Sequence, residues 1–316
     1  NNFSYPTDLS RYCLIQTMSS TLHSFSKLCL RDGRTLAWRE YGATAGYPII
    51  FTHGNLNSSL LQPSWSNTEQ HAIQANAKII AVDRPGYGDS TSHSSRTYID
   101  WASDVAELIT HLQIKKFAVV GYSSGGPHAL VCAAQKIPGL QACTLISSDA
   151  PYYKLGLNQP MYGTENVDLE YATTKAKLNY QNMIQSYKNM SKPERVEIAV
   201  ADINHAIKNG YHGAASDACL ESAVSWGFDL EKDIKMDVSC CPITVWHGTD
   251  DHDVPIVAGD YMSEMLGGKY VKLEGENHTL IRRHWLNILK STIETATTSS
   301  TEVESTEPTE LNVNKL

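Results

Sequence analysis

The sequence lacks a long apolar run, a surplus of basic residues and cysteines at metal-binding spacing. No apolar stretch reaches the roughly 18 residues that a membrane span needs, and residues 1–20 lack the apolar segment of a signal peptide. Lysine and arginine number 26 against 34 acidic residues, for a net charge of −8. Binding to nucleic acid would need clustered basic side chains. We therefore expect no membrane span, no nucleic-acid partner and an intracellular location.

The cysteines are odd in number and none of them forms a C-x-x-C pair, so a disulfide framework or a zinc site is not expected. The seven are Cys13, Cys29, Cys132, Cys143, Cys219, Cys240 and Cys241. We expect reduced and mostly buried thiols.

Apolar runs bounded by turn residues recur along the chain, with helix-like stretches between them. This pattern is typical of a mostly parallel sheet covered by helices. Asp32 and Gly33, a hairpin turn signal between the first two runs, predict that the sheet starts antiparallel. Eight strands are predicted, at 24–30, 35–41, 48–53, 77–83, 116–122, 142–148, 242–248 and 269–275.

The stretch 151–237 has helical spacing and no strand pattern. One long helix is predicted over 168–190 and another over 191–210, where Ser191 and Glu194 have the spacing of a capping box. We interpret 151–237 as a helical cap inserted between strands 6 and 7.

The remaining domain boundaries follow from composition. The core is predicted to comprise residues 24–150 and 238–293. Residues 1–23 precede the periodic pattern and are expected to be a flexible extension. Residues 294–316 are rich in Ser, Thr and Glu and poor in large apolar groups. Such a segment buries too little surface to offset its ordering entropy, so a disordered tail is expected.

One stretch, GYSSGG at 121–126, lies between an apolar run and a predicted helix. It fits the G-x-S-x-G nucleophile elbow, a turn so tight that a Cβ at either glycine would meet neighbouring backbone. Ser123 has glycine at both i−2 and i+2, whereas Ser124 has tyrosine at i−2. Ser123 is therefore the predicted nucleophile, and the backbone N–H of Ser124 is placed to face a developing oxyanion.

A serine nucleophile needs a general base, and that base needs an orienting carboxylate. Asp250, Asp251 and Asp253 follow a predicted strand, and His278 lies in a loop after the last strand. The order Ser, Asp, His along the chain is the one found in α/β-hydrolases.

The chain resembles the α/β-hydrolase superfamily over about residues 24–292. Four linked stretches carry the resemblance, and they are FTHGN at 51–55, DRPGYGDS at 83–90, GYSSGG, and HGTDDHDVP together with GENH. It implies the α/β-hydrolase fold, with a mostly parallel eight-stranded sheet flanked by helices. The family pattern puts the acid three residues after the glycine and three before Val-Pro, which selects Asp251.

The resemblance implies a catalytic triad of Ser123, Asp251 and His278. It also implies an oxyanion hole formed by the backbone N–H groups of Asn55 and Ser124. Some family members place the acid after the preceding strand of the sheet, so Asp149 stays open as an alternative.

Other polar residues of these stretches are expected to serve the structure. His53 is expected to order its loop, Asp83 and Arg84 to fix the turn after their strand, and His128 to pack or cap locally.

The chemistry implied is that of a serine hydrolase. It would cleave an ester, thioester or lactone of a small acyl metabolite through an acyl-enzyme, without a metal or organic cofactor. A hydrolase-like small-molecule binding protein or receptor and a cofactor-independent haloperoxidase remain alternatives. A dehalogenase or epoxide hydrolase of this fold needs a carboxylate nucleophile, which serine at 123 excludes.

The C-terminal tripeptide Asn314-Lys315-Leu316 differs from the peroxisomal address S-K-L at one position. It predicts a peroxisomal import receptor as a partner, with a cytoplasmic location as the alternative. The core also resembles hydrolases of fungal secondary-metabolite and toxin pathways, an analogy that does not fix a substrate.

Overall fold

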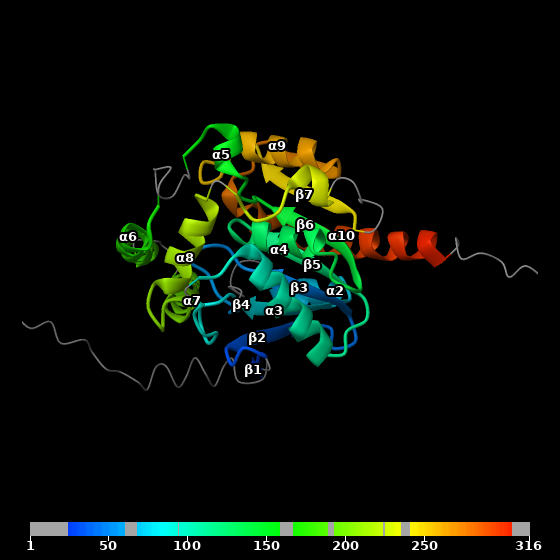
Figure 1. Cartoon of the computed structure of the whole chain (residues 1–316), viewed down its shortest axis with the longest axis horizontal. Coiled ribbons are helices and arrows are strands. Elements are labelled where there is room, and N and C mark those ends of the chain that lie inside the picture. The colour runs from blue at the N-terminus through cyan, green and yellow to red at the C-terminus, as the bar shows by residue number, and fades with distance from the viewer. Residues whose placement is uncertain are drawn as a thin grey trace, which may run out of the picture.

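The computed structural model describes residues 25–60, 68–93, 95–158, 167–188, 193–223, 225–234 and 241–304. Eight strands in these residues form one sheet (Figure 1). They are β1 (Phe25–Cys29), β2 (Thr35–Gly42), β3 (Tyr47–Thr52), β4 (Ala77–Asp83), β5 (Phe117–Tyr122), β6 (Leu140–Ile146), β7 (Ile243–Gly248) and β8 (Lys269–Leu273).

The order of the strands is β1-β2-β4-β3-β5-β6-β7-β8. β2 pairs antiparallel with both β1 and β4, and the pairs from β4 to β8 are parallel. The predicted antiparallel start is confirmed, and Gly33 adopts a φ of 84° in the turn between β1 and β2. The carboxyl ends of the parallel strands meet at one edge of the sheet, where ligands of α/β folds bind.

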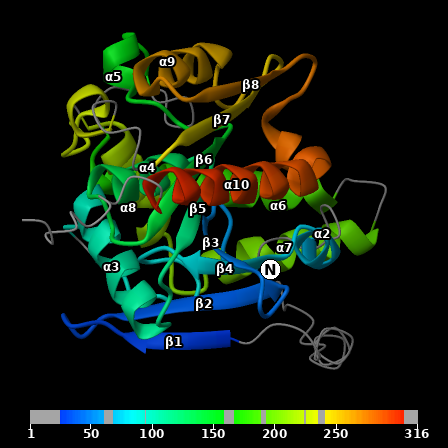
Figure 2. The same cartoon turned by 90° about the vertical axis from the view of Figure 1, so that its right-hand side faces the viewer.

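Helices cover both faces of the sheet, which explains why the central strands are apolar on both sides. One buried cluster joins the sheet to α3 (Tyr98–His111), α4 (Gly125–Ala134) and α9 (Ile256–Leu266). A second cluster, on the opposite face, joins it to α2 (Thr68–Gln74) and α10 (Ile281–Glu304). Figure 2 shows α10 lying across its face of the sheet.

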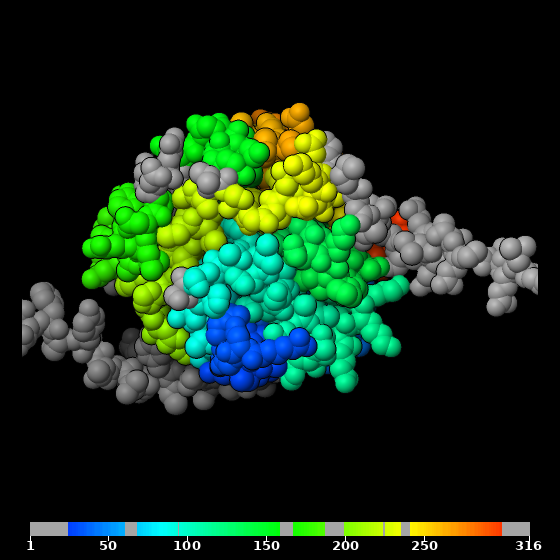
Figure 3. Space-filling model, viewed as in Figure 1, coloured from blue at the N-terminus to red at the C-terminus, as the bar shows by residue number. Residues whose placement is uncertain are grey.

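The described residues between β6 and β7 form helices and no strand. Their bounds are α5 (Tyr152–Leu155), α6 (Leu169–Lys188), α7 (Pro193–Ala206), α8 (His212–Glu221) and the π-helix η2 (Leu230–Ile234). The two predicted helices are present as α6 and α7, whereas α8 was not predicted. The capping-box residue Ser191 lies outside the described residues. In Figure 3 the atoms of α8, coloured yellow-green, lie against the cyan segment that contains α3.

The C-terminal helix α10 continues past residue 293, the last residue of the predicted core, and ends at Glu304. Ile293 packs against the core and Ala296 is fully buried, so apolar contacts continue beyond the expected boundary. Residues 1–23 and the tripeptide 314–316 lie outside the described residues. None of the helices in the described part of the chain is long and apolar enough to cross a membrane.

Candidate active site

Ser123 lies in the sharp turn between β5 and α4. Its backbone has a φ of 54°, the left-handed region that L residues rarely adopt. A Cβ on Gly121 would lie 2.5 Å from the carbonyl oxygen of Gly125, and one on Gly125 would overlap the carbonyl oxygen of Thr52. Both glycines are therefore required by close backbone approaches, which hold the serine at the end of β5.

The structure brings Ser123, His278 and Asp251 together at the carboxyl edge of the sheet. The Oγ of Ser123 lies 3.1 Å from Nε2 of His278. The other ring nitrogen of His278, Nδ1, lies 2.9 and 3.1 Å from the two carboxylate oxygens of Asp251. Asp251 follows β7, and His278 begins the 3₁₀ turn η4 (His278–Leu280) after β8. Three loops thus place the hydroxyl beside the imidazole and the imidazole beside the carboxylate.

The loop after β7 fixes the carboxylate of Asp251. Its Oδ1 accepts hydrogen bonds from the backbone N–H groups of Val254 at 2.8 Å and Asp253 at 3.0 Å. Although burial opposes ionisation, the hydrogen bond and the charge of His278 lower the pKa of Asp251. Burial likewise disfavours the imidazolium, but the hydrogen bond and the charge of Asp251 raise the pKa of His278 above its ordinary value.

Tyr122, the middle residue of Gly121-Tyr122-Ser123, also contacts the histidine. Its hydroxyl donates to the backbone carbonyl of His278 at 3.3 Å, and the two ring centroids are 5.3 Å apart. The G-x-S-x-G motif does not predict this contact, because it leaves the residue at that position unspecified. Tyr122 therefore helps to position the base.

Asp149 lies after β6, close to the same site but in a different role. Its carboxylate accepts a hydrogen bond from the hydroxyl of Tyr152, and its backbone N–H donates to the carbonyl of Ser123 at 3.3 Å. Burial raises the pKa of Asp149 to about 6, against the lowering effect of the Tyr152 hydroxyl. The geometry therefore favours Asp251 over Asp149 as the partner of His278.

The two residues predicted to form the oxyanion hole flank the nucleophile. Ser124 is the N-cap of α4, directly after Ser123. Asn55 follows Gly54, at which an added Cβ would lie only 3.0 Å from the Cβ of Ser123. The loop after β3 therefore lies directly against the serine.

His53 makes no hydrogen bond to the triad in the described structure. Its Nδ1–H donates to the carbonyl of Gly54 at 2.8 Å, and its Nε2 accepts from the backbone N–H of Arg84 at 3.2 Å. Burial and the Arg84 charge lower the pKa of His53 to about 3, so the ring is neutral. These contacts support the expected role in ordering the loop. The Arg84 side chain reaches farther than the turn, because its Nη2 donates to Ser124 Oγ at 2.9 Å.

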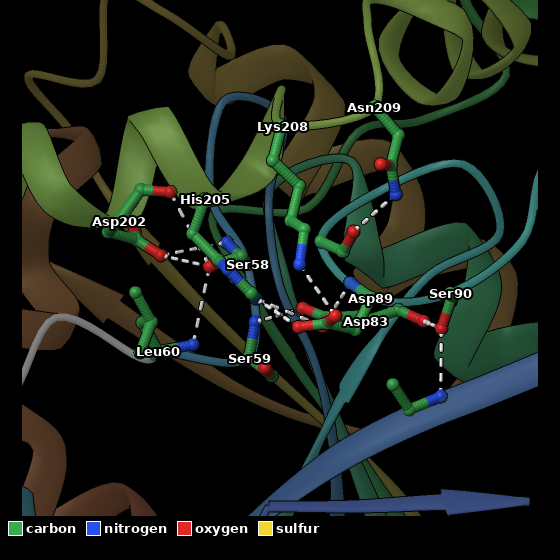
Figure 4. Close-up of polar contacts among 12 residues, drawn as sticks. Ser58, Ser59, Leu60, Asp83, Asp89, Ser90, Asp202, His205, Lys208 and Asn209 are labelled. Carbon is green, nitrogen blue, oxygen red and sulfur yellow. Dashed lines mark hydrogen bonds and ion pairs between the residues drawn. The ribbon is translucent and has the colours of Figure 1, made fainter.

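A second polar cluster joins the loop after β4 to α7 (Figure 4). Asp83, Asp89 and His205 present ligand atoms within 4.8 Å of one another, close enough to hold a metal ion. The Lys208 ammonium lies 2.6 Å from Asp89 Oδ1, and His205 Nε2 lies 3.2 Å from Asp83 Oδ2. A lysine and a histidine thus already supply cationic and hydrogen-bonding partners to these carboxylates.

Comparison with known proteins agrees with this architecture. The model of the alpha/beta hydrolase fold family matches residues 47–281. The chain therefore belongs to the alpha/beta hydrolase fold family, as the sequence motifs implied.

Two curated relatives and a solved structure illustrate the similarity. The chain is 29% identical to a non-heme chloroperoxidase of Streptomyces lividans over 80% of its own length and 92% of that protein. It is 25% identical to the non-heme chloroperoxidase CPO-A1 of Kitasatospora aureofaciens over 78% and 90% of the two chains. Its fold is similar to that of the esterase EaEST from Exiguobacterium antarcticum, with a TM-score of 0.65, 17% identity, and coverage of 87% and 100%.

Proposed function

We propose that the protein is a serine hydrolase that cleaves an ester, thioester or lactone of a small acyl metabolite. The observation that carries the proposal is the continuous hydrogen-bonded path from Ser123 through His278 to Asp251, with contacts of 3.1 and 2.9 Å. Within a fold family of hydrolases, this geometry supports nucleophilic catalysis by the serine.

In this mechanism Ser123 Oγ attacks the substrate carbonyl while Nε2 of His278 takes its proton. Asp251 stabilises the imidazolium through Nδ1–H, and the backbone N–H groups of Asn55 and Ser124 bind the oxyanion. The tetrahedral intermediate collapses as His278 gives the proton to the leaving alcohol or thiol. Water, deprotonated by His278, then releases the acid from the acyl-enzyme.

The test is a pair of neighbouring substitutions assayed with short p-nitrophenyl esters. Ser123→Ala removes the nucleophile and should lower kcat by roughly 10⁴-fold or more. Ser124→Ala keeps the backbone N–H and should retain activity to within about tenfold. Equal turnover by Ser123→Ala and the unmodified protein would refute the proposal, and loss of activity only in Ser124→Ala would reassign the nucleophile.

The similarity to non-heme chloroperoxidases favours a second candidate activity. An acyl-enzyme attacked by hydrogen peroxide instead of water would release a peracid, which can oxidise a halide. Halide-dependent bromination in acetate and hydrogen peroxide, absent in Ser123→Ala, would support this activity. Saturable binding across an ester panel without turnover would instead favour the receptor alternative.

We further propose that residues 151–237 cap the site and select the substrate, since Tyr152 of α5 and the helices α6–α8 all follow β6 in this segment. The secondary-metabolite role and the peroxisomal address at Asn314-Lys315-Leu316 remain predictions from the sequence. Imaging the chain with and without its last three residues tests the address.

A further inference from the structure

A buried carboxylate of α8, Asp217, lies behind the elbow. It has no exposed side-chain surface, and neither does its ion-pair partner Arg84. The Nη1 of Arg84 lies 2.7 Å from Oδ2 of Asp217, and the hydroxyl of Tyr87 lies 2.6 Å from the same oxygen. The guanidinium of Arg96 pairs with the other oxygen. The carboxylate of Asp217, from the segment between β6 and β7, thus binds three side chains of the loop between β4 and α3.

Arg84, the first of these three side chains, also contacts Ser124. Arg84 Nη2 donates to Ser124 Oγ at 2.9 Å, and Arg84 Nη1 donates to the Ser124 carbonyl at 3.3 Å. The Nδ1 of His128 lies 3.0 Å from the same carbonyl. The backbone N–H of Ser124 belongs to the preceding peptide unit and is joined to these two groups through Cα, so holding the side chain and the carbonyl restrains the residue that carries the N–H.

Tyr87, the second of these side chains, also contacts Asn55. The hydroxyl of Tyr87 lies 3.0 Å from Asn55 Oδ1 and has a single proton to share between Asn55 and Asp217. The Arg84 guanidinium lies over the Tyr87 ring, 5.0 Å from its centroid. Asp217 therefore influences Asn55 through Tyr87 and Ser124 through Arg84.

We propose that Asp217 is a positioning residue for the oxyanion hole, so that α8 controls how well the site stabilises the transition state. The inference rests on the proposed serine hydrolase function. An oxyanion hole works by preorganised donors, and loss of one donor typically costs 10²–10³-fold in kcat. In the described structure Asp217 makes no hydrogen bond or ion pair with Ser123, so its effect would pass through Asn55 and Ser124.

The experiment compares Asp217→Asn with Asp104→Asn. Asp104 is also a buried carboxylate paired with an arginine, Arg34, but it lies on α3, and Arg34 belongs to the turn between β1 and β2, away from the elbow. For each variant we would measure kcat and KM with p-nitrophenyl butyrate, and Ki for a trifluoromethyl ketone, which forms a tetrahedral oxyanion on serine.

Asp217→Asn should lower kcat roughly 10-fold or more with KM within about threefold, and it should raise the Ki of the ketone in proportion to the loss in kcat. Asp104→Asn should lower the melting temperature but leave kcat per folded molecule and Ki unchanged. If Asp217→Asn does not fold, Tyr87→Phe removes the branch to Asn55 and keeps the ion pair, and it should show a smaller loss of the same kind.

Wild-type kcat and Ki in a folded Asp217→Asn protein would overturn the inference but not the proposed hydrolase function. If Asp217→Asn does not fold, the same result in Tyr87→Phe would have this meaning. Failure of the unmodified protein to react with both the ester and a fluorophosphonate at Ser123 would overturn the proposed function, and the inference with it.

Discussion

At the scale of single residues, the hydrogen bonds of His278 determine the pH dependence of activity. The base must be neutral to accept the Ser123 proton, and the hydrogen bond and charge of Asp251 raise the pKa of His278 above the ordinary 6.5, outweighing its burial. Protonation grows as pH falls, so kcat/KM should be lost on the acid side, with a midpoint above 6.5. The measurement is kcat/KM for a p-nitrophenyl ester between about pH 5 and 9, beyond the ordinary pKa on both sides.

Replacing Asp251 with Asn belongs to the same prediction. It should lower kcat by roughly 10⁴-fold, because the imidazole loses the partner that fixes its tautomer and stabilises its cation. The acid midpoint of the residual activity should move to lower pH. Asp149→Asn is the control, and it should cost less than about tenfold because Asp149 does not pair with His278 Nδ1. The reverse order of losses would assign the acid to Asp149.

Parts of the site could be predicted because their signals are local. Glycine spacing separates Ser123 from Ser124, and the spacing of acids after a strand favours Asp251. The contacts of Arg84 could not be predicted in the same way. Its partner Asp217 also binds Tyr87, 130 positions earlier in the chain, and a single sequence contains no signal that joins residues so far apart.

At the scale of elements, each predicted strand overlaps an observed one. The central strands are buried on both faces and are continuous apolar runs with turn residues at their ends. The edge strands β1 and β8 have exposed and half-buried residues, and the turn residues that bound them gave the signal. α8 was missed for the opposite reason. Its sequence, HGAASDACLE, is made mostly of small residues, and the buried side of the helix includes two acidic residues, Asp217 and Glu221. Without an apolar stripe at helical spacing, the segment gives no signal of a helix.

The end of α10 yields a prediction of its own. Ala296 is fully buried although it lies in the segment expected to be a tail. Ala296→Asp would bury an unpaired charge and should lower the free energy of unfolding by several kcal/mol. Thr297→Asp adds the same charge on the exposed face of the same turn, and it should change stability by less than about 1 kcal/mol. Urea unfolding monitored by circular dichroism measures both, and equal stability of the two variants would mean that the helix past residue 293 does not contribute to the fold.

At the scale of the whole molecule, polar contacts join the segment between β6 and β7 to the core. Apolar contacts join it as well, through one small cluster and through Trp226, Leu230 and Ile234, which belong to the larger cluster on one sheet face. Asp202 of α7 accepts from the backbone N–H of Ser58 at 3.0 Å (Figure 4). Asp83, at the end of β4, accepts from the backbone N–H groups of Ser59 at 2.7 Å and Asp89 at 3.0 Å. One core carboxylate thus ties two loops together and also faces His205 of α7.

This position of Asp83 makes it a source of pH-dependent stability. Burial opposes its ionisation, but the hydrogen bonds and the charge of His205 lower the pKa of Asp83 below its ordinary 3.8. A carboxyl group whose pKa is depressed by folding stabilises the folded state above the unfolded pKa, and this contribution is lost as pH falls through the folded pKa. The free energy of unfolding should therefore decrease as the solution is acidified below about pH 5.

Asp83→Asn should lower the free energy of unfolding by about 3–5 kcal/mol at pH 7, because it leaves His205 and the loop N–H groups without the charge that binds them. Its stability should also fall less steeply than that of the unmodified protein between about pH 5 and 3. Asp260→Asn, which breaks an exposed pair with Lys272, is the matched control and should cost less than about 1 kcal/mol. Urea unfolding at a series of pH values tests both. Parallel pH curves for Asp83→Asn and the unmodified protein would show that the carboxylate of Asp83 does not link pH to the contact between the core and the segment from β6 to β7.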